Sequence, residues 1–171
     1  WDMAFTKSEG SAKVAGFVMG RSGADIYVFD LVNEKMTFTE SVAAVRTLSG
    51  KWPKARAKVV ENKANGPAIV DLLKKKIAGM VEFNPKGSKE ERALSTTPYF
   101  EAGNIFLPDP STAPWVHDLI QDLLMFPKGV YKDDIDALVQ GILYLMDKPS
   151  MTGPPSDDSA LIKESYWTRR R

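Results

Sequence analysis

The feature that most constrains the fold of this sequence is an alternation of short apolar runs with capped helices. From residue 37 onward, short apolar runs alternate with longer segments whose apolar side chains have helical spacing. The apolar runs have the length of buried strands. Two helices begin with the Ser/Thr-x-x-Glu pattern of a capping box, at Thr37–Glu40 and Ser88–Glu91. The expected strands are residues 57–61, 80–83 and 104–107, and the expected helices are residues 38–52, 66–78, 89–97, 114–124 and 135–146.

Two β-rich runs before this alternation indicate how the sheet is built. Residues 14–19 and 26–32 flank Gly20–Gly23, which predicts a β-hairpin. A hairpin followed by strand–helix units favours an α/β fold, with a mixed central sheet flanked by helices on both faces. Right-handed crossovers between parallel strands would bring the first strand, at Asp2, beside the strand that ends at Glu61.

Composition excludes several kinds of chemistry. The chain has no cysteine, so disulfides, zinc–thiolate sites and cysteine nucleophiles are excluded. His117 is the single histidine, which argues against a Ser-His-Asp triad. The net charge of +1 excludes a polycationic DNA-coating protein but permits a local basic groove. Catalysis would therefore depend on carboxylates, lysine, tyrosine or a metal ion.

One domain accounts for most of the 171 residues. A chain of this length typically forms a single core, which we assign to residues 1–147. From Lys148 onward, prolines, glycine and polar residues predominate, so residues 148–171 are expected to form a flexible tail. No apolar run approaches the roughly 20 residues that cross a bilayer, and no membrane partner is expected.

Four acidic residues stand near the ends of expected core elements: Asp2, Glu61, Asp133 and Asp134. Adjacent aspartates repel each other, and a divalent cation would relieve that repulsion. Each residue alone has a simpler explanation, since Asp133 can cap the last helix and Asp134 suits the helix dipole. Together they favour a metal site.

Such a site suits phosphodiester hydrolysis without a nucleophilic side chain. Mg²⁺ and Mn²⁺ prefer carboxylate oxygens as ligands. Two ions about 3.5–4 Å apart can activate a water and stabilise the leaving oxygen. The sequence therefore predicts a site for two Mg²⁺ or Mn²⁺ ions, with Asp2, Glu61, Asp133 and Asp134 as catalytic ligands.

Several segments form a pattern that is specific when they are taken together. In order along roughly residues 1–147, they are Trp1–Phe5, Val60–Ala68, Asn84–Ala93, Phe100–Asn104, Leu107–Pro108 and Lys132–Leu138. This pattern resembles the C-terminal nuclease domain of the large terminases of tailed phages. The resemblance implies a ribonuclease H-like fold and a metal-dependent endonuclease that cuts concatemeric double-stranded viral DNA as packaging starts and ends.

The resemblance also implies roles and partners. Asp2 would be the first-strand ligand, Glu61 the second acid, and Asp133 and Asp134 the acids of the last helix. Which of these two adjacent aspartates binds metal directly stays open, and Asp136 is a weaker candidate one helical step further in. The partners would be double-stranded DNA, an N-terminal ATPase domain of the same polypeptide, the small terminase subunit and the portal. The expected location is the host cytoplasm, and transiently the portal of the procapsid. The chain has no Gly-x-x-x-x-Gly-Lys-Ser/Thr loop, so it is not expected to drive translocation.

The sequence departs from the family at two places. Lys132 stands where relatives often have a histidine, and residues 8–13 contain no second aspartate, with Glu9 as the acid in that region. A lysine in its charged form cannot ligate a metal, but it can contact a phosphate.

A nuclease that cuts many sequences is expected to grip phosphates rather than bases. The basic residues expected to do so are Lys63, Lys86, Lys89, Arg92 and Lys132.

Two other functions stay open at the level of sequence. Another ribonuclease H-like nuclease, of resolvase or integrase type, would prefer branched to linear DNA. A non-catalytic domain that docks on DNA or on the portal would have no need of tight manganese sites.

Overall fold

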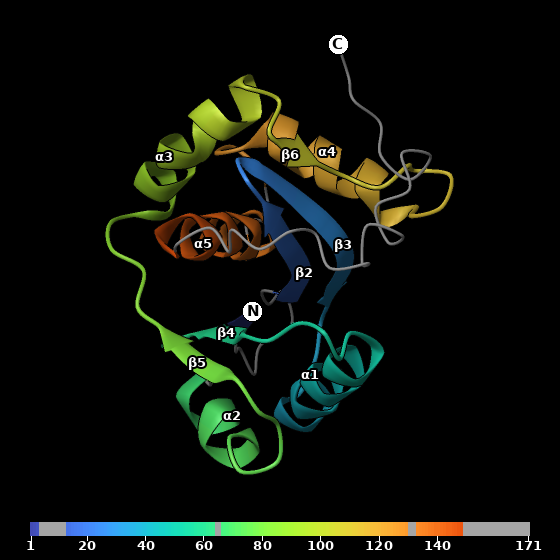
Figure 1. Ribbon diagram of the computed structural model, residues 1–171, viewed down its shortest axis with the longest axis vertical. Helices are drawn as coiled ribbons and strands as arrows, with labels where there is room; N and C mark the ends of the chain where they lie inside the picture. Colours follow the sequence, from blue (N-terminus) through green and yellow to red (C-terminus); the bar gives the residue numbers. More distant parts are fainter. Residues whose placement is uncertain (4–12, 64–65, 130–132, 149–171) are drawn as a thin grey trace.

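The computed structural model describes residues 1–3, 13–63, 66–129 and 133–148, and its elements follow the predicted order (Figure 1). The strands are β1 (Asp2–Met3), β2 (Val14–Ser22), β3 (Asp25–Glu34), β4 (Lys58–Glu61), β5 (Met80–Phe83) and β6 (Ile105–Phe106). The helices are α1 (Phe38–Lys51), α2 (Gly66–Leu73), α3 (Lys89–Glu101), α4 (Trp115–Met125) and α5 (Asp133–Asp147). The predicted alternation is confirmed, while residues 149–171 of the expected tail lie outside the described residues.

The strands form a mixed arrangement around β1. β2 pairs antiparallel with both β1 and β3, and β6 adds parallel to β3. β4 and β5 form a separate parallel pair. Backbone hydrogen bonds join the two groups, because the Trp1 amine donates to Val59 O at 2.8 Å and Glu61 N–H donates to Trp1 O at 3.0 Å. The predicted proximity of the strands at Asp2 and Glu61 is thus confirmed.

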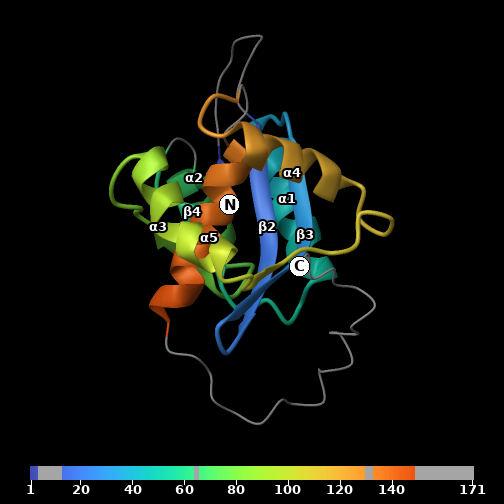
Figure 2. The ribbon, with the colours of Figure 1, turned by 90° about the horizontal axis from the view of Figure 1, so that it is seen from above.

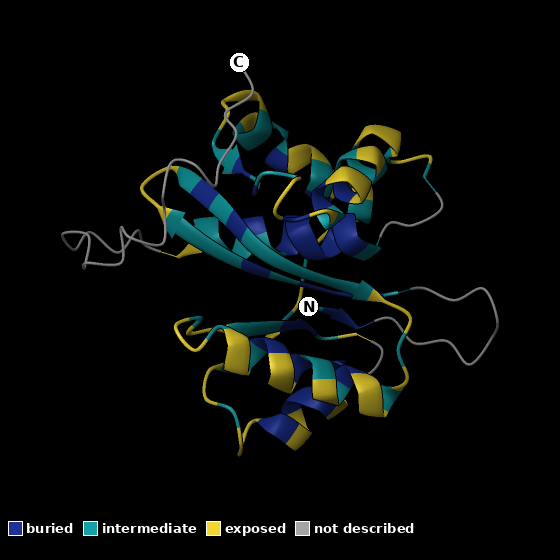
Figure 3. Ribbon diagram, turned by 90° about the vertical axis from the view of Figure 1, so that its right-hand side faces the viewer, coloured by how far each residue is buried: buried dark blue, intermediate teal, exposed yellow. Residues whose placement is uncertain are grey.

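Helices cover both faces of this sheet. α3, α4 and α5 lie on one side, and α1 and α2 lie on the other (Figures 1 and 3). α5 packs along β2, as the view from above also shows (Figure 2). The core on the side of α1 and α2 contains Met3, Val14, Val45, Val60, Ile69, Val70 and Leu73. The core on the side of α3, α4 and α5 contains Ile26, Val28, Leu119, Leu138 and Ile142.

One helix is shorter than its apolar spacing predicts. α2 ends at Leu73, whose carbonyl accepts hydrogen bonds from both Lys76 N–H and Ile77 N–H and so closes a tightened last turn. Gly79, which the pattern suggested as the helix stop, instead serves the turn into β5. Its φ of +81° is in the left-handed region, and a Cβ there would lie 1.9 Å from Arg56 O.

Candidate metal centre

Strand alternation directs Asp2 and Glu61 to the same side of the sheet. Met3 and Val60 belong to the core beneath α1 and α2. Their sequence neighbours Asp2 and Glu61 therefore project to the opposite face, which α5 covers. Both are buried, with exposures of 7% and 3%. Two carboxylates from neighbouring strands thus enter the interior of the protein beneath one helix.

A close approach at Gly66 fixes the end of β4. A Cβ at this first residue of α2 would lie 1.9 Å from Glu61 O and 3.2 Å from a methyl carbon of Val60. Only glycine leaves room for the helix to begin against the strand end. The turn after Glu61 therefore holds the backbone from which its carboxylate projects.

α5 supplies the third carboxylate of the cluster, and it is Asp136. One carboxylate oxygen each of Asp2, Glu61 and Asp136 lies within 4.8 Å of the other two. Asp136 is only 2% exposed. The sequence indicated this residue as a weaker candidate than Asp133 and Asp134, but the structure places it close to the two acids of the sheet.

Asp133 lies at the edge of the cluster. It is one helical turn before Asp136 and therefore on the same face of α5. Its Oδ1 is 3.4 Å from Lys89 Nζ, and its Oδ2 accepts a hydrogen bond from Lys13 N–H at 3.1 Å. Asp133 thus joins the other carboxylates through a shared lysine.

Asp134 points away from the cluster. Its Oδ2 accepts a hydrogen bond from Asn33 Nδ2 at 3.2 Å, and its Oδ1 accepts one from Ile135 N–H at 2.8 Å. Burial, followed by a hydrogen bond with Asp122 of α4, raises the pKa of Asp134 to about 6. The structure therefore separates the adjacent aspartates: Asp133 lies beside Asp2, whereas Asp134 packs toward β3 and α4.

The cluster is electrostatically suited to a cation. Burial raises the pKa of Asp2 to about 7; Lys89 opposes that rise, and Glu61, Asp136 and Asp133 reinforce it. A carboxyl group that is costly to ionise because it is buried, and because its neighbours are acidic, gains most when a divalent ion replaces its proton. The donor set consists of carboxylate oxygens, which suit Mg²⁺ and Mn²⁺.

The predicted phosphate-binding residues lie in different settings. Lys63 is exposed and forms an ion pair with Glu61 at 2.8 Å, and Lys86 is exposed. Lys89 has its ammonium within the acidic cluster. Arg92 is 3% exposed, so it is not available to a phosphate in this structure. Lys132 lies outside the described residues.

Arg92 instead joins α3 to α5. Its guanidinium contacts Asp136 Oδ1 at 2.5 Å and donates to Gly87 O at 2.8 Å. A buried ion pair of this kind holds Asp136 in place, since loss of either partner would leave the other charge buried. Nothing local in the sequence distinguishes Arg92 from the exposed basic residues around it.

The helical period contains a signal for Asp136. Residues three apart share a helix face, whereas adjacent residues are about 100° apart around the axis. Asp133 and Asp134 therefore cannot both face one site from the same helix. Asp133 and Asp136 can, and the spacing Asp-x-x-Asp would have indicated the pair that the structure places near Asp2.

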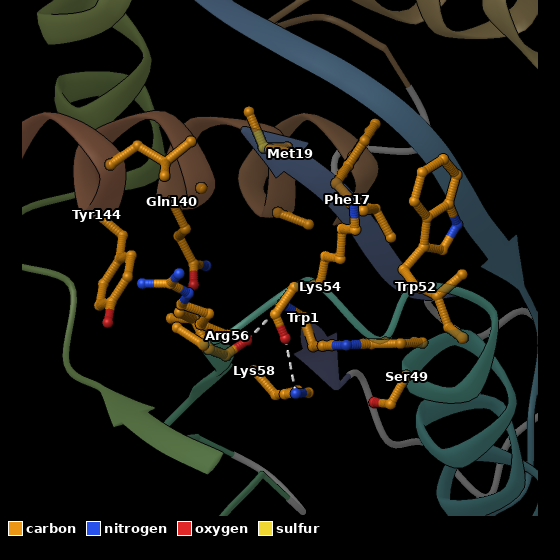
Figure 4. Close-up of a pocket in the computed structure, with 18 of the residues that line it drawn as sticks. Trp1, Phe17, Met19, Ser49, Trp52, Lys54, Arg56, Lys58, Gln140 and Tyr144 are labelled. Atoms are coloured by element: carbon orange, nitrogen blue, oxygen red, sulfur yellow. Dashed lines mark hydrogen bonds between the residues drawn. The ribbon is translucent and has the colours of Figure 1, made fainter. Parts of the chain in front are cut away.

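A cavity of about 390 Å³ lies beneath α5 (Figure 4). Trp1 and Ala137, the sequence neighbours of Asp2 and Asp136, are part of its wall. Gln140 extends from α5 toward Arg56, and its buried Nε2 has no hydrogen-bond partner among the described residues. The other large side chains of the wall include Phe17, Met19, Trp52, Lys54, Lys58 and Tyr144.

Comparison with known proteins agrees with this geometry. A family model described as a terminase RNaseH-like domain matches residues 1–145, from β1 into the last turns of α5. No curated protein matches the chain. Within the described residues, none of the helices has the length and apolar character needed to cross a membrane.

Proposed function

Because the chain belongs to the terminase RNaseH-like domain family, we propose that it is the metal-dependent endonuclease domain of a viral terminase large subunit. It would cut concatemeric double-stranded DNA during genome packaging. The proposed partners are DNA, an ATPase domain of the same polypeptide, the small terminase subunit and the portal. The proposed location is the host cytoplasm, with transient residence at the portal of the procapsid.

The observation that carries this proposal is the convergence of Asp2, Glu61 and Asp136. These residues come from β1, β4 and α5, and their carboxylate oxygens lie within 4.8 Å of one another. Burying three acids together is costly unless a cation compensates them. Their common ligand chemistry suits Mg²⁺ or Mn²⁺.

Each residue near the cluster has a proposed task. Asp2, Glu61 and Asp136 would hold the metal ions, and Asp133 is placed to add a fourth carboxylate. When bound, two ions would supply an activated water and charge stabilisation for the leaving oxygen. Lys63 and Lys86, which are exposed, would hold the DNA backbone. Lys132, which lies outside the described residues, is proposed to do the same. Asp134 is proposed to support the packing of α5 rather than to bind metal.

Plasmid cleavage in the presence of Mn²⁺ tests the assignment. Glu61→Gln and Asp136→Asn keep the side-chain shape but remove a ligand charge. We expect each to reduce cleavage by more than about 100-fold, because loss of even an outer-shell partner of a metal typically costs 10–100-fold. Asp71→Asn, on the exposed face of α2, is the matched control and should cut as the unmodified chain does.

Asp134→Asn separates this assignment from the one made on sequence alone. Because Asp134 contacts Asn33 and Asp122 rather than the cluster, its variant should retain most of the cleavage activity. Loss of cutting in Asp134→Asn with full cutting in Asp136→Asn would reverse the roles of the two residues. A marked preference for branched over linear DNA would instead favour a resolvase-type nuclease. Full cleavage by both Glu61→Gln and Asp136→Asn would exclude the proposed site.

A further inference from the structure

Lys89 places a fixed positive charge among the carboxylates. Its Nζ lies 3.2 Å from Asp136 Oδ2, 3.4 Å from Asp133 Oδ1 and 3.5 Å from Asp2 Oδ2. These oxygens come from β1 and from both acidic positions on one face of α5. The lysine itself comes from α3, so one ammonium contacts carboxylates of two other elements.

The start of α3, where Lys89 lies, is an unfavourable place for a positive charge. Lys89 is the first residue of the helix, directly after the N-cap Ser88, where the helix dipole is positive. The capping box of Ser88 and Glu91 fixes this helix start by hydrogen bonds in both directions. The three carboxylates, rather than the helix, therefore account for a lysine at this place.

The backbone around Lys89 is held, while its side chain has room to turn outward. Arg92, one turn later on α3, is tied to Asp136 and to Gly87 O. By contrast, the Lys89 side chain is 35% exposed, and a lysine stem has four rotatable bonds. A change of rotamer can thus move the ammonium without displacing α3.

We propose that Lys89 is a built-in counter-ion that competes with divalent metal for the carboxylate cluster and turns toward DNA phosphate when metal binds. This inference rests on the proposed function. A divalent ion held by Asp2 and Asp136 would share their carboxylates with Lys89, and two cations this close to each other repel. Displaced from these carboxylates, the ammonium remains beside the site, on its exposed side, where a phosphate would lie.

Two properties follow from such competition. Without metal, Lys89 offsets the repulsion among the acids and helps the protein to remain folded. With metal, the protein must first give up these contacts, which lowers the apparent affinity for the ion. Removing the lysine should therefore weaken the metal-free fold and strengthen metal binding, which is opposite to the effect of removing a ligand.

Calorimetric titration of the whole chain with Mn²⁺ alone, in DNA-free buffer, tests the proposal. Lys89→Met keeps much of the side-chain volume and removes the charge. We expect its Kd for Mn²⁺ to fall at least about tenfold, and its melting temperature in chelator to fall below that of the unmodified chain. Lys75→Met, on an exposed position after α2, removes the same charge and should change neither quantity.

Lys89→Arg separates the effect of the charge from a general effect of replacing Lys89, because it keeps the positive charge. It should bind Mn²⁺ no more tightly than the unmodified chain does. If the unmodified chain binds Mn²⁺ and Lys89→Met binds it equally or more weakly, the competition is refuted while the metal centre stands. If neither the unmodified chain nor any variant binds Mn²⁺, the proposed function is refuted, and the proposed competition is refuted with it.

Discussion

Burial changes the acid–base behaviour of Asp2 in a way that favours the binding of a cation. Its carboxyl group is close to Glu61, Asp136 and Asp133, and burial raises its pKa to about 7. At neutral pH the group is therefore near the midpoint of its titration. A divalent ion that takes the place of the proton acts on a group already poised to lose it.

The raised pKa values predict a stability that falls as pH rises. Asp2, with a pKa of about 7, and Asp134, with a pKa of about 6, keep their protons in the fold but lose them near pH 3.8 when unfolded. Their stabilising contribution is complete below about pH 3.8 and is lost as pH rises through the folded values. We expect the metal-free chain to lose on the order of 2–3 kcal/mol between pH 4.5 and 6.

Urea unfolding in chelator across this range measures the effect. The buried amine of Trp1, whose pKa burial lowers to about 6, acts in the opposite sense at higher pH, so the comparison stays at or below pH 6. Asp134→Asn should make the decline shallower, because it removes one of the two titrating groups. A stability that rises steadily from pH 4.5 to 6 would contradict the proposed protonation of both carboxyl groups.

At the scale of elements, the cluster depends on how α2, α3 and α5 meet the sheet. α5 carries Asp136, and α3 fixes that residue through Arg92. α2 begins against the end of β4 at Gly66, directly beside the backbone of Glu61. Elements that carry no carboxylate of the cluster therefore still determine where its carboxylates lie.

Gly66→Ala should disturb the site without touching an acid. The new methyl group would meet Glu61 O at 1.9 Å, so the start of α2 or the end of β4 must shift. We expect a loss of about 1–3 kcal/mol of unfolding free energy, together with weaker Mn²⁺ binding. Urea denaturation and calorimetric titration measure the two effects.

Gly50→Ala is the matched control for that variant. Gly50 lies in α1, and a Cβ there would have nothing within 4 Å. Alanine favours a helix over glycine by up to about 1 kcal/mol, so this variant should be as stable as the unmodified chain or more so. Equal losses in both variants would show that the close approach at Gly66 is not what matters.

At the scale of the whole molecule, the order of elements and the mixed sheet could be predicted because their signals are local. The capping boxes at Thr37 and Ser88 and the turn around Gly23 each act over a few residues, and each is present in the structure. The place of Lys89 and the burial of Arg92 could not be predicted in the same way. Both depend on α3 meeting α5, a contact between segments more than forty residues apart.

Metal binding should stabilise the whole domain, because the proposed ligands come from β1, β4 and α5. An ion present at 100 times its Kd adds about 2.7 kcal/mol to the free energy of unfolding. For a chain of this length that corresponds to a rise of roughly 5–10 °C in melting temperature. The rise should vanish in Asp136→Asn, and an equal rise in that variant would place the bound metal elsewhere.

The clustered acids lie far apart in the sequence, so the ribosome makes them at different times. More than a hundred residues separate Asp2 from Asp136. At 5–20 residues per second, the ribosome adds them over roughly 7–27 s. During that interval a nascent chain has its first acid but lacks α5, so it cannot bring the three carboxylates together. For the proposed nuclease, the order of synthesis is thus a safeguard: cutting cannot begin until the last described helix has been made.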